Sequence, residues 1–235
     1  MKKTILSLIL FIQVGFSATP EQLEEYLMIS QADRDLIEME QMMEGFLPSG
    51  STKNTEMISI RFNEYLEKNL SEDELTELIE LYHNPLLQIL RETNSEIPDE
   101  ELKEFNLSIQ ETPLSTERLD LNQNIIKNMF DDEDLKNLLY GLESKISEIF
   151  GQEKESQSIT KEDEKAFIKE MREELKLPML YTTQVLSMEE LTELKELTDI
   201  SILKKANKVE LKASMYAMEN FLEEMMQGIM NTTIQ

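Results

Sequence analysis

The stretch LSEDELTELIELYHNPLLQIL, residues 70–90, is repeated in altered form as LSMEELTELKELTDISILKKA, residues 186–206. A shift of 116 residues aligns the two stretches without a gap, and ten of the 21 aligned positions are identical. Convergence between two amphipathic helices explains the shared Ser and Leu residues, but helix formation does not require the shared Thr76 and Thr192. The pattern favours duplication of one helical unit, whose copies pack together to bury apolar faces that neither could bury alone.

Local signals in and around this repeat predict helices. Ser71 with Glu74, and Ser187 with Glu190, form the capping-box pattern that starts a helix. Leu, Glu, Lys, Met and Gln, which favour helices, dominate the composition, whereas the strand former Val occurs three times. We therefore predict an all-α fold of two related helical units, with roughly eight to ten short helices packed as a bundle-like array.

Apolar spacing within the repeat predicts the core. Leucines recur three residues apart in both copies, as on the buried face of a helix. They are Leu75, Leu78 and Leu81 in the first copy and Leu191, Leu194 and Leu197 in the second. We expect Tyr82 to pack beside the first trio, with its hydroxyl reaching solvent or a polar partner. Pro113 and Pro178 mark predicted helix ends, and the last helix is expected to start near Ser201.

The first 18 residues have the order of a secretory signal peptide. Lys2 and Lys3 precede an apolar run, and the small residues Gly15 and Ser17 fit cleavage after Ser17 or Ala18. An uncleaved anchor is less favoured, because the run is shorter than the roughly 20 apolar residues that span a bilayer. We expect a periplasmic or secreted bacterial protein with no stable membrane anchor after removal of the signal. The predicted organisation is a signal peptide (1–18), a first helical repeat unit (19–112) and a second helical repeat unit (113–235).

The chain is strongly acidic, with a formal net charge of −25, and loss of the two signal-peptide lysines takes it to −27. Such a field repels nucleic acid and anionic lipid, so it argues against a nucleic-acid partner and favours neutral or cationic ones. A solvated acidic surface is the simpler interpretation. With no Cys and one His, the chain can form no disulfide, thiol nucleophile or zinc site of the usual type. We predict no catalytic residue, no metal and no cofactor.

The segment ELIELYHNPLL, residues 77–87, carries a further signal. Its helix reaches Tyr82 and breaks at Asn84-Pro85, where Asn84 can cap the next helix. The segment resembles the signature of a family of exported bacterial helical domains, domain of unknown function number two thousand and fifty-nine. Members of that family carry an acidic capped helix, an aromatic pair ending in Tyr, then Ser-Pro and a small residue. Tyr82 and Pro85 fit this pattern, whereas Leu81, Asn84 and Leu87 replace the usual Phe, Ser and small residue.

The second copy departs further from that signature. It keeps the preceding segment PMLY, residues 178–181, in the family's manner, but it has Thr198 where Tyr is expected and Ser201 where Pro is expected. The resemblance therefore implies an all-helical periplasmic domain in two copies, the second degenerate. The family itself brings no established activity.

Three patterns have alternative interpretations as reactive or ligand sites. Glu residues at positions 74, 77 and 80 recur at 190, 193 and 196, and could form an acid pair or a calcium site. Their spacing fits a solvated helix face more simply. The run Asp131–Asp134 resembles the start of a cation loop, but an acidic helix N-terminus explains it more simply. His83 could be a lone general base, although an exposed turn residue is the simpler interpretation.

Methionine is frequent, with 15 residues. Thioether clusters can bind copper or silver, and Met-rich helix faces adapt to varied apolar partners, while filling of an ordinary core is the simpler explanation. We expect a protein or peptide partner to meet Met39, Met43, Met218 and Met225. The sequence thus predicts an exported, non-catalytic protein that binds a protein or peptide. The alternatives are a holdase-like chaperone with a Met-rich apolar surface or, less favoured, an acid-dependent hydrolase using the duplicated Glu residues.

Overall fold

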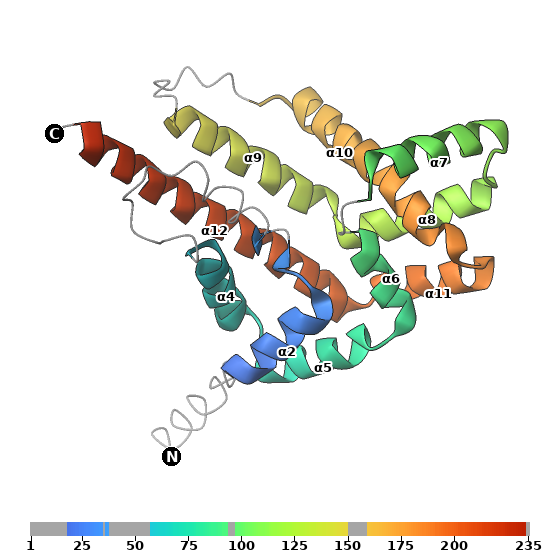
Figure 1. The fold of residues 1–235 in the computed structure, drawn as a ribbon, viewed down its shortest axis with the longest axis horizontal. Coiled ribbons are helices and arrows are strands. Elements are labelled where there is room, and N and C mark those ends of the chain that lie inside the picture. Colours follow the sequence, from blue (N-terminus) through green and yellow to red (C-terminus); the bar gives the residue numbers. More distant parts are fainter. Residues whose placement is uncertain (1–17, 35, 38–56, 94–96, 150–158, 234–235) are drawn as a thin grey trace, which may run out of the picture.

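The computed structural model describes residues 18–34, 36–37, 57–93, 97–149 and 159–233. These residues form ten α-helices and one short 3₁₀ helix without a strand, which confirms the all-α prediction (Figure 1). The elements are α2 (Pro20–Ser30), α4 (Met57–Asn69), α5 (Glu72–Tyr82), α6 (Pro85–Thr93), α7 (Asp99–Glu111), α8 (Thr116–Met129), α9 (Asp132–Ile149), α10 (Lys161–Thr182), η1 (Thr183–Val185), α11 (Met188–Thr198) and α12 (Ser201–Thr233). Within this part of the chain, no helix is both long and apolar enough to cross a membrane. The predicted signal peptide lies outside the described residues, except for Ala18.

The predicted starts of both repeated helices are confirmed. In α5 the Ser71 hydroxyl accepts a hydrogen bond from the Glu74 N–H at 3.3 Å, while the Glu74 carboxylate accepts from the Ser71 N–H at 3.0 Å. The same two hydrogen bonds, at 3.2 and 2.8 Å, start α11. Each reciprocal pair satisfies two backbone donors that the first turn would leave unpaired. After α5, the Asn84 side chain accepts from the Leu86 N–H at 2.9 Å, so Asn84 caps α6 as predicted.

The shift of 116 residues also relates the helix bounds of the two similar stretches. It carries the bounds of α5 onto those of α11, and the first residue of α6 onto the first residue of α12. The predicted core leucines at positions 75, 78, 191 and 194 are fully buried, with 0% exposure, and Leu81 and Leu197 pack at the edge of the core. The predicted start of the last helix at Ser201 is also confirmed.

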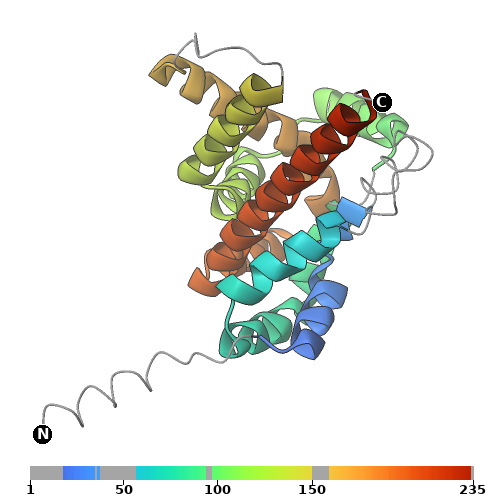
Figure 2. The same cartoon turned by 90° about the vertical axis from the view of Figure 1, so that its left-hand side faces the viewer.

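The correspondence extends to helix packing. Helix α2 packs on α4 and α5, as α8 packs on α10 and α11. The helix that follows each repeated helix crosses to the other unit: α6, after α5, contacts α10 and α11, while α12, after α11, contacts α4 and α5. Figure 2 shows α4 running beside α12 over much of the length of α4. One hydrophobic cluster therefore runs across the predicted boundary between the units, which falls in the turn between α7 and α8.

Pro178 does not end a helix, so that prediction was wrong. Helix α10 continues through Pro178 to Thr182 before η1 begins. A proline inside a helix removes one backbone hydrogen bond and costs about 3 kcal/mol. The next two residues, Met179 and Leu180, are 4% and 3% exposed, and their burial offsets much of that cost. Tertiary packing overrides the local signal here. Pro113, in contrast, follows the end of α7 as predicted.

Helix α9 joins the second unit by packing on α10 and α12 (Figure 1). A Cβ atom added at Gly141 would lie 2.3 Å from the Met215 Cε, so α9 and α12 approach closely there. At the start of α9, the Asp131 carboxylate accepts from the Asp134 N–H at 2.8 Å. Lys208 of α12 lies 3.3 Å from the Asp134 carboxylate. The acidic run is thus a helix N-terminus held by a lysine, as the simpler interpretation of the sequence had it.

Candidate functional site

The four predicted methionine contacts are described only in part. Met39 and Met43 lie outside the described residues, and Met225 lies in α12 beyond the side chains that the structure describes. Met218 is half-buried and packs against the hydrophobic core. Met218 thus contacts the core and is also partly exposed, and all four partner contacts remain predictions.

The duplicated acids do not form a buried pair. Glu77, Glu80 and their counterparts at 193 and 196 are exposed, and Glu74 and Glu190 cap their own helices. Burial raises the pKa of Glu74, but the hydrogen bond and charge of Lys205 and the hydrogen bonds with Ser71 together outweigh that effect, so the pKa is lowered overall. No cluster of three or more potential metal-ligating His, Cys, Asp or Glu side chains occurs among the described residues. His83 is an exposed residue that ends α5.

A groove runs between α2 and α4, with an open volume of about 530 Å³. Its apolar lining includes Leu23 and Leu27, which are nearly buried, and Met28, which is 73% exposed. Its remaining lining residues are Pro20, Glu24, Asp33, Asn63 and Glu67. An apolar floor with an exposed methionine at its edge is a surface suited to a partner's apolar side chain.

The polar groups of this α2–α4 groove have one sign of charge. It is lined by three carboxylates and, among the described residues, by no Lys, Arg or His. Burial raises the pKa of Asp33, because desolvation disfavours its charged form. The Asn63 Oδ1 atom is buried and has no hydrogen-bond donor within the described part of the chain. The groove thus has a negative field, and one of its lining residues carries a buried acceptor without a donor among the described residues.

A second cavity, of about 190 Å³, lies where the two helical units meet, and we call it the junction pocket. Three pairs of its lining residues are related by the shift of 116 residues: Tyr82 and Thr198, Leu87 and Leu203, and Arg91 and Asn207. The pocket is therefore built from equivalent positions of the two copies, at the points where α5 passes into α6 and α11 into α12.

Tyr26 and Glu210 connect α2 to α12 beside the junction pocket. The Tyr26 ring is fully buried, and its hydroxyl donates to the Glu210 carboxylate. The Tyr82 ring packs edge-on against that of Tyr26, with 5.9 Å between ring centroids, and the two hydroxyls interact. Tyr82 thus packs beside the core with a polar partner, as predicted. Glu210 is half-buried as a residue, but its carboxyl meets a fully buried hydroxyl and so lies in the interior.

Burial controls the ionisation of these groups. Desolvation raises the pKa of Glu210, although the hydrogen bond from Tyr26 works in the opposite direction. Desolvation, followed by the nearby Glu210 charge, raises the pKa values of both Tyr26 and Tyr82. Both tyrosines are therefore neutral hydrogen-bonding groups at physiological pH, whereas the Glu210 proton is held more tightly than that of an exposed glutamate.

Arg91 supplies the positive charge of the junction pocket. Its Nη2–H donates to the Met28 carbonyl at 2.9 Å, which ties α6 to α2. Its Nε atom is buried and has no acceptor among the described residues. A buried donor without an acceptor costs about 1–3 kcal/mol, so a ligand that accepts from this atom would remove that cost.

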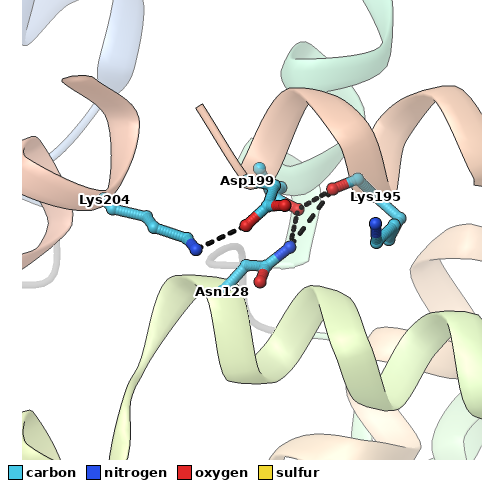
Figure 3. Close-up of polar contacts among 5 residues, drawn as sticks. Asn128, Lys195, Asp199 and Lys204 are labelled. Carbon is cyan, nitrogen blue, oxygen red and sulfur yellow. Dashed lines mark hydrogen bonds and ion pairs between the residues drawn. The ribbon is translucent and has the colours of Figure 1, made fainter. Parts of the chain in front are cut away.

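A polar network lies at the end of α11, beside the pocket-lining Thr198 (Figure 3). The Asn128 side chain donates to the Lys195 carbonyl and to the Thr198 hydroxyl, both at 3.2 Å. The next residue, Asp199, pairs with Lys204 of α12. Asn128 thus ties Thr198 to α8, and the Asp199–Lys204 pair joins the end of α11 to α12.

Sequence reasoning did not identify Glu210, Arg91 or Asn207. Two signals were present. The alignment of the repeats, extended by one residue beyond position 206, pairs Arg91 with Asn207. Glu210 follows the buried Leu203 by seven residues, which is two helical turns and therefore the same face of α12. A charged residue on an apolar helix face is the pattern that marks a buried ionisable group.

Comparison of the chain with protein-family models, with curated proteins and with solved structures found no match.

Proposed function

We propose that this chain is a non-catalytic binding protein whose partner is a protein or peptide segment that carries both apolar and basic side chains. The partner would dock in the α2–α4 groove. The observation that carries this proposal is the composition of the groove as the described residues form it: an apolar floor, three carboxylates, no cationic lining residue, and the buried Asn63 Oδ1 without a donor.

Each of these features matches a part of such a partner. An apolar side chain placed on Leu23, Leu27 and Met28 would gain about 25 cal/mol for every Å² removed from water. An N–H of the partner would satisfy Asn63 Oδ1. A Lys or Arg side chain near Asp33 would favour the charged carboxylate that burial now disfavours. Exposed carboxylates gain little from pairing, so Glu24 and Glu67 would steer and orient the partner more than they would hold it.

We further propose that the chain is exported with removal of residues 1–18, and that it arose by duplication of one unit related to domain of unknown function number two thousand and fifty-nine. The order of charged, apolar and small residues at the N-terminus supports export. The common shift of 116 residues in sequence, helix bounds and lining of the junction pocket supports duplication. N-terminal sequencing of the secreted form tests the first point; a sequence beginning at Met1 would disprove it.

A peptide titration tests the groove. The probe is a fluorescent amphipathic helix of about 18 residues made of Leu and Lys, and its counterpart has Glu in place of Lys. We expect the basic peptide to bind, with an affinity that falls as salt is added, and the acidic peptide not to bind. In the double variant Glu24→Lys/Glu67→Lys, binding of the basic peptide should weaken by about tenfold or more.

The matched control is Glu193→Lys/Glu196→Lys, which changes the net charge equally at two exposed positions of α11. Binding by this control should stay within about twofold of the unchanged protein once salt screens long-range charge. Equal loss in both double variants would show attraction to the overall charge rather than to the groove. Full binding by Glu24→Lys/Glu67→Lys would overturn the proposed docking site.

A further inference from the structure

The junction pocket contains two opposite charges that do not neutralise each other. Arg91 and Glu210 both line it, and no ion pair joins them in the part of the chain described. A guanidinium has five N–H donors, and the Arg91 Nε is buried without an acceptor among the described residues. A carboxylate can accept about four hydrogen bonds, and the Tyr26 hydroxyl is the partner that the described residues give Glu210. Each charged group therefore has bonding capacity left for a ligand.

The rest of the wall combines apolar side chains with the polar Ser30, Thr198, Asn207 and Ser214. The larger apolar side chains come from both units: Leu87, Leu90, Met129, Phe130, Leu203 and Leu211. The volume of about 190 Å³ is below the roughly 300–1,000 Å³ of pockets that hold drug-sized ligands. The pocket therefore suits a molecule of few heavy atoms with a short hydrocarbon part.

We infer that the junction pocket binds a small zwitterion of the amino-acid class with an aliphatic side chain. The ligand's carboxylate pairs with Arg91, its ammonium pairs with Glu210, and its side chain packs against the leucines. A ligand with only one charge would leave the other buried group without a counter-charge, which is costly in an interior of low dielectric. This inference is independent of the proposed function, because the α2–α4 groove and the junction pocket have different lining residues.

Divergence between the copies gives the ligand one orientation. Arg91 in the first unit corresponds to the uncharged Asn207 in the second, so only one side of the pair is cationic. Tyr82 corresponds to the smaller Thr198, so the aromatic pair with Tyr26 forms on one side. A pocket between identical copies would accept a ligand in two equivalent orientations, whereas this pocket distinguishes the ends of a zwitterion.

Calorimetric titration of the purified mature chain with three probes tests the inference without any variant. The probes are L-leucine, 4-methylpentanoate, which lacks the amine, and 3-methylbutylamine, which lacks the carboxylate. We expect L-leucine to bind, and each half-analogue to bind about tenfold more weakly or worse. Failure of L-leucine to bind would overturn the inference, as would binding of either half-analogue with the affinity of L-leucine.

Two variants locate the site. Glu210→Gln keeps an acceptor for Tyr26 but removes the charge, and Arg91→Gln removes the guanidinium. We expect each to weaken L-leucine binding by about tenfold or more. Glu196→Gln, at an exposed position of α11, is the matched control and should bind unchanged. Circular dichroism and the urea midpoint verify that each variant is folded, and undiminished binding by folded Glu210→Gln would overturn the assignment.

Discussion

The carboxyl group of Glu210 lies on the face of α12 that carries the buried Leu203 and the buried Ala217, each seven residues away. The polar Asn207 and Ser214 share that face and line the junction pocket with it. The hydroxyl that donates to this carboxyl belongs to Tyr26 of α2, which is far from Glu210 in sequence. Spacing alone therefore predicts the buried face but not the partner that makes a charged group tolerable there. The leucines of the repeat, in contrast, need no specific partner, and the sequence predicted their burial.

At this scale, pH tests whether Glu210 is buried. Its pKa is raised on folding, so the folded chain binds a proton more tightly than the unfolded chain. Stability should therefore fall as pH rises from the ordinary glutamate pKa of about 4.3 to the raised pKa of the folded chain. The loss should be about 1.4 kcal/mol for each pH unit that separates these two pKa values. The Glu210→Gln variant has no ionisable group at this position and does not lose this stability. Its free energy of unfolding relative to that of the unchanged chain should therefore increase as pH rises between the two pKa values.

Urea unfolding of both proteins at a series of pH values measures this difference. Glu196→Gln serves as the control, since Glu196 is exposed. If Glu210→Gln and the unchanged protein lost stability in parallel from acid to neutral pH, the carboxyl group would be solvated and not in the interior.

At the scale of single elements, local chemistry predicted the starts of both repeated helices and failed at one supposed helix end. Ser71 and Ser187 form capping boxes because the bonds join residues three apart, which the sequence displays directly. The prediction that a helix ends at Pro178 was wrong, because burial of Met179 and Leu180 offsets the free-energy cost of a proline inside the helix. Caps are thus readable from sequence, whereas a tolerated proline depends on packing that only the folded chain supplies.

Removal of either cap gives a matched pair of variants. Ser71→Ala and Ser187→Ala should each lower the free energy of unfolding by about 1 kcal/mol, because each leaves the N3 backbone N–H without its acceptor. Urea midpoints measure the loss, and a Gly variant at the same position should lose only a few tenths of a kcal/mol. An unchanged midpoint in both Ala variants would contradict the role of the repeat as a capped helix start.

The contact of α9 with α12 gives another test at this scale. Gly141→Ala removes a helix cost of about 1 kcal/mol but forces the flexible end of Met215 to move, so the net change should stay below about 1 kcal/mol. Movement of the Met215 side chain does not make enough room for Leu, so Gly141→Leu should lower the free energy of unfolding by about 1–3 kcal/mol. Thermal unfolding separates the two, and equal stability of both variants would show that α9 and α12 are not in close contact.

For the whole molecule, the repeat predicted that two copies pack on each other, but not how. The exchange of α6 and α12 between units, and the pocket that it creates, depend on contacts between residues far apart in sequence. The same is true of Arg91 and Glu210, whose roles appear only when the two copies are brought together. The predicted boundary near Pro113 coincides with the turn between α7 and α8 and does not separate two cores.

Because α6 and α12 each pack on the other unit, we predict that the two units unfold cooperatively. Leu78 and Leu194 are equivalent, fully buried residues of α5 and α11 that belong to one hydrophobic cluster. Leu78→Ala and Leu194→Ala should each lower the free energy of unfolding by about 2–5 kcal/mol. Because one core spans both units, each variant should destabilise both units and not only its own.

Hydrogen exchange measured by mass spectrometry along a urea series tests the interlocked fold most directly, since peptides from α5 and α11 report on each unit separately. The interlocked fold predicts that both helices lose protection in one coincident transition, and that Leu78→Ala or Leu194→Ala moves that transition to lower urea for both helices together. Loss of protection in α5 alone in Leu78→Ala, with α11 still protected at the same urea concentration, would show two independent domains and contradict it.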